Sequence, residues 1–287
     1  MLDENAIGLS LEQKYTYTWR DILLYNLSVG AKSDDVNYVY EKDLKVIPTF
    51  GVIPCTCTFG TEPYSAQPLM PTKMIEGIKT EGTLHMDHFL KVHRPIPQEA
   101  TLQIKKTIRN VYDRGEGKGA KINVEIVGLD ENGNEIFTNT MGYLNRWAGG
   151  FGGSPIPKST VEIPEREPDC TLGDSYPLNA PLIYRLTGDT FPLHADPAFA
   201  QKSGFSGPIV HGLCSLGYAC RLMVDKVLGG DVSRFVSIEN QFRSVAMPGD
   251  SFILELWNET DGETLFRMKN KADQKAILDY GKMTWKI

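Results

Sequence analysis

Residues 208–230 read PIVHGLCSLGYACRLMVDKVLGG, and this stretch decides the fold of the second half of the chain. Apolar side chains recur at helical spacing across residues 213–227, so the stretch predicts one long buried helix. The pair Gly229-Gly230 ends this helix, because glycine readily adopts the backbone conformation of a helix terminus. Four strand-like runs follow between residues 234 and 287. A helix wrapped by an antiparallel sheet is the simplest structure for this half.

The first half repeats this order of elements in weaker form. An apolar segment that begins at residues 48–51 precedes four strand-like runs between residues 85 and 147. The chain between them is rich in Pro, Gly and charge, which predicts a linker. We therefore expect an α+β chain in three parts: residues 1–150, a linker at 151–180, and residues 181–287.

Composition narrows the class of function. The chain has 287 residues and a net charge of −6, which argues against nucleic acid as a partner, because phosphate neutralisation needs clustered Lys and Arg. No apolar run approaches the roughly 20 residues of a membrane span, so no membrane partner is expected. Cys55 and Cys57 form a CxC pair, but a zinc site needs a second pair of ligands, and the five cysteines do not supply it.

Residues 184–197, YRLTGDTFPLHADP, hold the densest group of polar side chains. Asp189 and His194 are separated by a turn with Gly188 at one end and Pro192 at the other, and a turn can direct both side chains to one point. The carboxylate can hold or deprotonate a water, and the imidazole can hold the same water or return a proton. The spacing alone is also compatible with structural roles, such as a capping Asp and a hydrogen-bonded His.

A second group of histidines lies in the strand-like run that begins at residue 85. Strand alternation places His85, Asp87 and His93 on one face and His88 on the other. His93 lies roughly 20 Å from Asp87 along an extended strand, too far for joint ligation. We therefore expect no metal site.

The run from Tyr184 to Pro197, followed by His211-Gly212-Leu213, resembles the hydratase 2 motif of MaoC-like dehydratases. The whole chain is similar to the hydratase 2 region of eukaryotic peroxisomal multifunctional enzyme type 2, because residues 22–31, 47–53 and 149–153 are also family-like. This resemblance implies a double hot-dog fold, with two antiparallel sheets that each wrap a central helix. It implies further that the second half keeps the active residues and the first half accommodates the acyl chain.

The resemblance makes Asp189 and His194 the catalytic pair and the Gly212 N–H a donor to the thioester oxygen. A preorganised donor at that oxygen contributes roughly 3 kcal/mol in the transition state. We expect Tyr184, Asp196 and His211 to frame the loop or the substrate, with aromatic packing, turn capping and a structural hydrogen bond as the respective alternatives.

One position departs from the family pattern. Where Gly-Asp-x-Asn-Pro usually supplies an Asn that positions the catalytic water, this chain has Phe191. Three explanations stay open: a reduced activity, another group that supplies the hydrogen bond, or a deliberate substitution.

The resulting hypothesis is reversible hydration of trans-2-enoyl-CoA to (3R)-3-hydroxyacyl-CoA in fatty acid β-oxidation, with no cofactor beyond the CoA of the substrate. One alternative is a hot-dog thioesterase, although the carboxylate that such enzymes carry near the central helix is missing from residues 213–224. Another is a non-catalytic acyl-CoA binding module in which Phe191 closes the water site. The resemblance also implies a peroxisomal location, although the chain carries no clear targeting signal, and fusion to dehydrogenase domains. We expect a homodimer, because hot-dog proteins commonly pair through their sheets.

Overall fold

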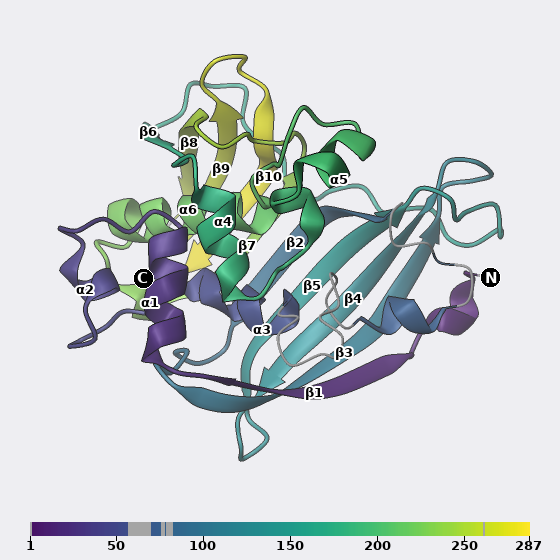
Figure 1. The fold of residues 1–287 in the computed structure, drawn as a ribbon, viewed down its shortest axis with the longest axis horizontal. Coiled ribbons are helices and arrows are strands. Elements are labelled where there is room, and N and C mark those ends of the chain that lie inside the picture. Colours follow the sequence, from purple (N-terminus) through teal and green to yellow (C-terminus); the bar gives the residue numbers. More distant parts are fainter. Residues whose placement is uncertain (1, 57–69, 76–77, 79–82, 261) are drawn as a thin grey trace.

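The computed structural model describes residues 2–56, 70–75, 78, 83–260 and 262–287. Its central feature is a ten-stranded antiparallel sheet (Figure 1). The strands of the first half are β1 (Ser10–Tyr17), β2 (Thr83–Val92), β3 (Ala100–Asp113), β4 (Ala120–Leu129) and β5 (Glu135–Asn145). The strands of the second half are β6 (Cys170–Ser175), β7 (Phe235–Phe242), β8 (Ser251–Thr260), β9 (Glu263–Asn270) and β10 (Ala276–Trp285).

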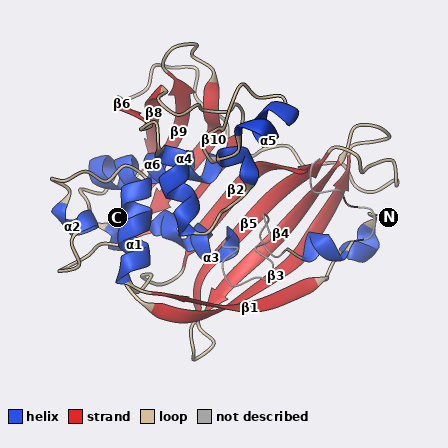
Figure 2. Cartoon of the chain, in the orientation of Figure 1, coloured by secondary structure: helices blue, strands red, loops and turns tan. Residues whose placement is uncertain are grey.

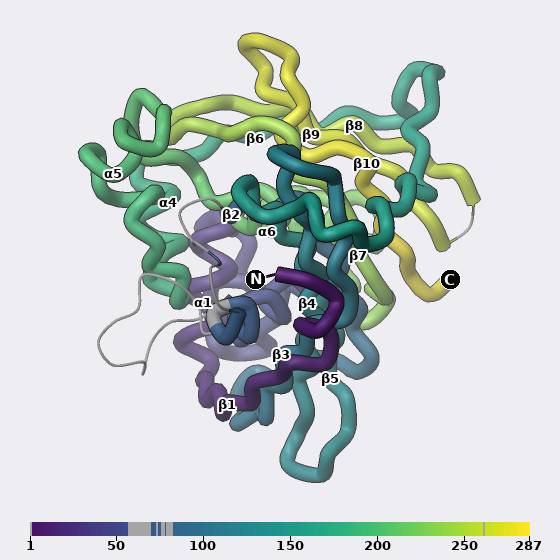
Figure 3. Tube along the Cα trace, turned by 90° about the vertical axis from the view of Figure 1, so that its right-hand side faces the viewer, coloured from purple at the N-terminus to yellow at the C-terminus, as the bar shows by residue number. Residues whose placement is uncertain are grey.

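The strand order supports an internal duplication. From its outer edge inward, the first half runs β1-β3-β4-β5-β2 and the second runs β6-β8-β9-β10-β7. Each half therefore places its five strands in the same sequence: first, third, fourth, fifth, second. In Figure 3, β8, β9 and β10 lie at the top of the molecule and β1, β3 and β5 lie below.

The two expected sheets form one continuous sheet. Strand β2 pairs with β7, from Asp87 opposite Gln241 to Lys91 opposite Ser237. Both strands are the innermost of their half, so each would otherwise present a row of unpaired backbone groups. The division into two sheets is therefore wrong in detail, while the two-unit architecture holds.

The helices lie mainly on one side of this sheet (Figure 2). The α-helices are α1 (Trp19–Ser28), α2 (Val36–Val39), α3 (Ile53–Thr56), α4 (Ala180–Tyr184), α5 (Pro197–Lys202) and α6 (Gly212–Val227). The 3-10 helices are η1 (Glu4–Ala6), η2 (Pro48–Val52), η3 (Pro71–Met74), η5 (Arg185–Thr187), η6 (Pro192–His194) and η7 (Val232–Arg234).

Helix α6 is the long buried helix that its apolar periodicity predicts. Its core-facing side chains, including Leu216, Met223 and Val224, are fully buried. The chain leaves the helix through Gly229 and Gly230, both with positive φ, as expected. The corresponding apolar segment of the first half is the buried run of η2 and α3, which the structure describes as far as Thr56.

The predicted linker at 151–180 contains a β-strand that its composition does not predict. Residues 170–175 form β6, which pairs with β8 at the outer edge of the sheet. An edge strand has only one neighbour and a largely exposed surface, so it needs no apolar run. The remaining domain boundaries stay predictions.

The cysteines fit a packing role. Cys55, Cys214 and Cys220 are buried free thiols, and burial raises the pKa of Cys55 to about 12, which disfavours a reactive thiolate. Cys57, the other member of the CxC pair, lies outside the described residues. Among the helices that the structure describes, none is long and apolar enough to cross a membrane.

Candidate active site

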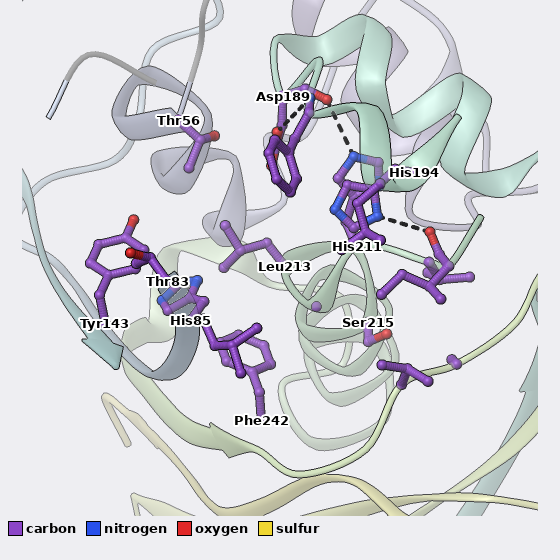
Figure 4. Close-up of a pocket in the computed structure, with 18 of the residues that line it drawn as sticks. Thr56, Thr83, His85, Tyr143, Asp189, His194, His211, Leu213, Ser215 and Phe242 are labelled. Carbon is purple, nitrogen blue, oxygen red and sulfur yellow. Dashed lines mark hydrogen bonds between the residues drawn. The ribbon is translucent and has the colours of Figure 1, made fainter. Parts of the chain in front are cut away.

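A cavity of about 460 Å³ lies between the two halves and collects the candidate catalytic residues. Its wall includes Thr56, His85 and Tyr143 from the first half, and Asp189, His194, His211, Gly212 and Phe242 from the second. Figure 4 shows Asp189, His194 and His211 together on one side, with His85 and Tyr143 on the other. Both halves therefore build one site.

The loop that carries Asp189 and His194 is shaped by a glycine and a proline. After η5 the chain turns at Gly188, whose φ of 136° is strained for any residue with a Cβ atom. Pro192 then begins η6, which ends at His194. The turn places both Asp189 and His194 on the cavity wall, as their spacing predicts.

His194 is held in one tautomer. Its Nδ1–H donates to the backbone carbonyl of Ile209 at 2.8 Å, because a carbonyl can only accept. The Nε2 atom of the neutral ring therefore keeps its lone pair. Burial lowers the pKa of His194, although the nearby Asp189 carboxylate opposes this shift, so the neutral ring predominates at physiological pH. Such a ring can accept a proton from a water.

Asp189 shows the opposite shift. Burial raises the pKa of this carboxyl group, while His194 and the backbone N–H of Phe191, 3.3 Å from Oδ1, lower it. A carboxylate oxygen of Asp189 lies within 4.8 Å of ring nitrogens of His194 and His211. A carboxyl group that protonates more readily beside an imidazole that protonates less readily is the arrangement of an acid–base pair.

Gly212 is the first residue of α6 and lies on the cavity wall. The N–H of a first helical residue has no partner within its helix, so it can donate to a ligand at the positive end of the helix dipole. A Cβ atom at this position would lie 2.8 Å from Cδ1 of Phe242. Glycine therefore allows the backbone and the Phe242 ring to approach closely at this wall.

The framing residues differ in their roles. Tyr184 is fully buried and does not line the cavity. Its ring centroid lies 4.7 Å from that of His211. Asp196 caps α5 by accepting from the backbone N–H of Ala198 at 2.8 Å, which is the turn-capping alternative. Phe191 lines the cavity, and its ring centroid lies 6.3 Å from that of His194.

His211 is buried beside the pair. Its ring is stacked on the ring of His194 with a centroid distance of 3.6 Å and an interplanar angle of 22°. Its Nε2–H donates to the backbone carbonyl of Asp189 at 3.3 Å. The structural hydrogen bond considered for His211 is thus present, and its acceptor belongs to a catalytic candidate.

The expected placement of His85 and His88 on opposite faces of β2 is wrong. The register between β2 and β5 shifts between His85 and Asp87, so one residue is added on β2 and the alternation restarts. The two imidazole rings consequently lie 5.4 Å apart. His93 lies beyond the end of the strand and contacts Thr138 Oγ1 at 2.9 Å through Nε2.

The bulge brings into the site a residue that sequence reasoning placed elsewhere. His85 lines the cavity, where its ring packs 5.0 Å from Tyr143 and 4.8 Å from Phe242. The sequence pattern indicated neither Tyr143 nor Phe242 as a site residue. Strict alternation along β2 does not predict that His85 faces the cavity, because no residue type in this run indicates the extra residue of the bulge.

Asp189, His194 and His211 bring two kinds of metal-ligand atom, carboxylate oxygen and imidazole nitrogen, within 4.8 Å of one another. Backbone carbonyls occupy Nδ1 of His194 and Nε2 of His211. The remaining lone pairs lie in nearly parallel ring planes. The two hydrogen bonds leave one nitrogen on each ring without a backbone partner, and we expect this group to serve acid–base chemistry and not to hold a metal ion.

Comparison with known protein families matches both halves of this architecture. Residues 15–146 match the MFE-2 hydratase 2 N-terminal domain, and residues 162–279 match the MaoC like domain. The chain is 37% identical to the peroxisomal hydratase-dehydrogenase-epimerase of Neurospora crassa, over 92% of this chain but only 29% of that protein. It is 31% identical to the peroxisomal enoyl-CoA hydratase 2 of Arabidopsis thaliana, over 93% of this chain and 90% of the relative.

Solved structures support the fold. A MaoC-like dehydratase from Phytophthora capsici superposes with a TM-score of 0.87 at 29% identity, covering 99% of this chain and 98% of that one. A Mycobacterium tuberculosis protein described as having a double hot-dog fold superposes with a TM-score of 0.61 at 12% identity, covering 97% of this chain and 96% of that one. The double hot-dog prediction is therefore confirmed, and the chain belongs to the MaoC-like hydratase 2 family.

Proposed function

We propose that this chain is an R-specific 2-enoyl-CoA hydratase, which adds water reversibly to trans-2-enoyl-CoA in fatty acid β-oxidation. The observation that carries the proposal is the meeting of Asp189, His194 and the start of α6 at Gly212 on one cavity wall. The names of the relatives, which include enoyl-CoA hydratase 2, point to the same reaction.

The geometry supports a separate role for each of the three residues in the reaction. The lone pair on Nε2 of His194 takes a proton from a water as its oxygen bonds to C3 of the enoyl group. The electrons of the C2–C3 double bond move toward the thioester oxygen, which accepts a hydrogen bond from the Gly212 N–H. The Asp189 carboxylate accepts a hydrogen bond from the same water and orients it, and the protonated ring of His194 then returns its proton to C2. One water is added, and no electron leaves or enters the substrate.

This chemistry needs no redox group and no metal, because it moves only water and protons. We therefore propose that the CoA of the substrate is the one non-protein component. Arg146 and Arg243 are exposed on the cavity wall, and their guanidinium groups suit the phosphates of CoA, despite the net negative charge of the chain.

Several relatives carry this region within longer enzymes, and some have peroxisomal in their names. We propose a peroxisomal setting, a homodimer, and fusion to dehydrogenase domains where the chain is part of a longer polypeptide. A thioesterase and a non-catalytic acyl-CoA binding module remain the competing functions.

Product analysis separates these functions. We expect crotonyl-CoA or a longer trans-2-enoyl-CoA to give (3R)-3-hydroxyacyl-CoA, identified by chiral chromatography, and Asp189→Asn to abolish the product. Release of free CoA would indicate a thioesterase. Unchanged substrate that nevertheless binds would indicate the binding module.

A further inference from the structure

His211 is linked to all three proposed catalytic residues, Asp189, His194 and Gly212, although the proposed mechanism gives it no proton to transfer. It bonds to the backbone of Asp189, stacks on the ring of His194 and directly precedes Gly212. We propose that His211 is a positioning residue, which fixes the acid–base pair relative to the Gly212 N–H through one hydrogen bond and one ring stack. This inference rests on the proposed function and adds a residue to it.

The contacts of His211 argue against a role in proton transfer. The Asp189 carbonyl requires the proton on Nε2, so Nδ1 of the neutral ring is unprotonated, and it has no hydrogen-bond partner among the described residues. Burial lowers the pKa of His211 well below its ordinary value, and nearby His194 acts in the same direction. The ring is therefore neutral at physiological pH, which suits a positioning role.

The position of His211 also argues against simple helix capping. It is the N-cap residue of α6, yet its side chain makes no capping hydrogen bond. Its ring instead contacts the rings of Tyr184 and His194, at centroid distances of 4.7 and 3.6 Å. Only 2% of the surface of His211 is exposed, so these contacts fix the ring, and the fixed ring in turn restricts the ring of His194 stacked on it.

Each contact can be removed separately. His211→Phe keeps a ring against His194 but loses the donor to Asp189. His211→Gln keeps an amide donor but loses the ring stack, and His211→Ala loses both. The exposed His93→Ala, remote from the cavity, controls for the loss of a histidine as such.

We expect kcat for enoyl-CoA hydration to fall roughly tenfold in the Phe and Gln variants and further in the Ala variant, because a small misalignment of catalytic groups is costly. KM should stay within about threefold, since only 2% of the surface of His211 is exposed and little of it can contact the substrate. The acidic limb of the pH–kcat profile should shift to higher pH. Water that enters a loosened site raises the pKa of His194 toward its ordinary value, so the ring loses its neutral form at a higher pH. His93→Ala should change none of these quantities.

A structural role predicts a different pattern. If kcat stays within threefold of wild type in folded Phe and Gln variants, or if kcat falls only in proportion to a loss of Tm with an unmoved pH profile, the positioning role is wrong. Those two variants decide the question even if His211→Ala does not fold. A wild-type chain that fails to hydrate enoyl-CoA would overturn the proposed function itself, and this inference with it.

Discussion

Phe191 stands where the family pattern has an Asn, and its surroundings decide what this substitution does. The ring lines the cavity, packs edge-on against Phe199 at 5.3 Å and lies near His194. A phenyl ring offers neither a donor nor an acceptor to a water held by Asp189 and His194. Its backbone N–H, by contrast, contributes to the site by bonding to the Asp189 carboxylate. We therefore expect the side chain of Phe191, and not the loop conformation, to limit the rate of hydration.

Phe191→Asn should raise kcat by roughly threefold to a hundredfold, because one hydrogen bond to a reacting water is worth about 0.5–1.5 kcal/mol and more in the transition state. KM should change little. Phe191→Leu is the matched control, since it reduces the ring without adding a polar group. Steady-state kinetics on one enoyl-CoA substrate provide the test, and an unchanged or lower kcat in the Asn variant would mean that another group already positions the water.

At the scale of elements, the long helix α6 and eight of the strands follow from sequence patterns, because burial on at least one face imposes periodicity. The strands that sequence reasoning did not identify, β1 and β6, are the two edges of the sheet. The bulge in β2 could not be predicted either, because it depends on how β2 pairs with β5 and not on the sequence of β2 alone. The meeting of Asp189 and His194 on one wall was predictable because a turn places them locally, whereas the position of His85 on the cavity wall depends on pairing between distant strands.

The start of α6 yields a prediction of its own. Gly212→Ala should reduce kcat at least tenfold, because the new Cβ atom presses against Phe242 and displaces either the ring or the helix start beside the substrate. Gly217→Ala is the matched control, since Gly217 lies on the same helix outside the cavity wall and its new Cβ atom would press against Val29 at the end of α1. We expect that variant to lower Tm while keeping kcat. Equal kcat in both variants would remove the special role of Gly212.

At the scale of the whole molecule, the junction of β2 and β7 joins the halves through a buried polar cluster. His88 lies opposite Asn240 across this junction and donates from Nε2 to Asn139 Oδ1 at 2.9 Å. Burial lowers the pKa of His88 from 6.5 to about 4. Below pH 6.5 the His88 ring takes up a proton in the unfolded chain but stays neutral in the folded chain. The contribution of neutral His88 to the free energy of unfolding is therefore complete above pH 6.5 and is lost as the pH falls toward 4.

Between pH 7 and pH 5 this single group should reduce the free energy of unfolding by about 2 kcal/mol, at about 1.4 kcal/mol per pH unit below 6.5. His88→Gln keeps a donor for Asn139 and removes the titrating ring. Urea unfolding of both proteins at the two pH values should show a smaller loss in the variant by that amount. Equal losses would mean that His88 is protonated in the folded chain.

The central claim is that Asp189 and His194 act together on one water, and a double-mutant cycle tests it most directly. Asp189→Ala and His194→Ala should each reduce kcat by about 100- to 10,000-fold, because either loss disables proton transfer. The double variant should be no slower than the more impaired single variant, since neither group can act alone on the shared water. A double variant whose loss in activation free energy equals the sum of the two single losses would contradict the account.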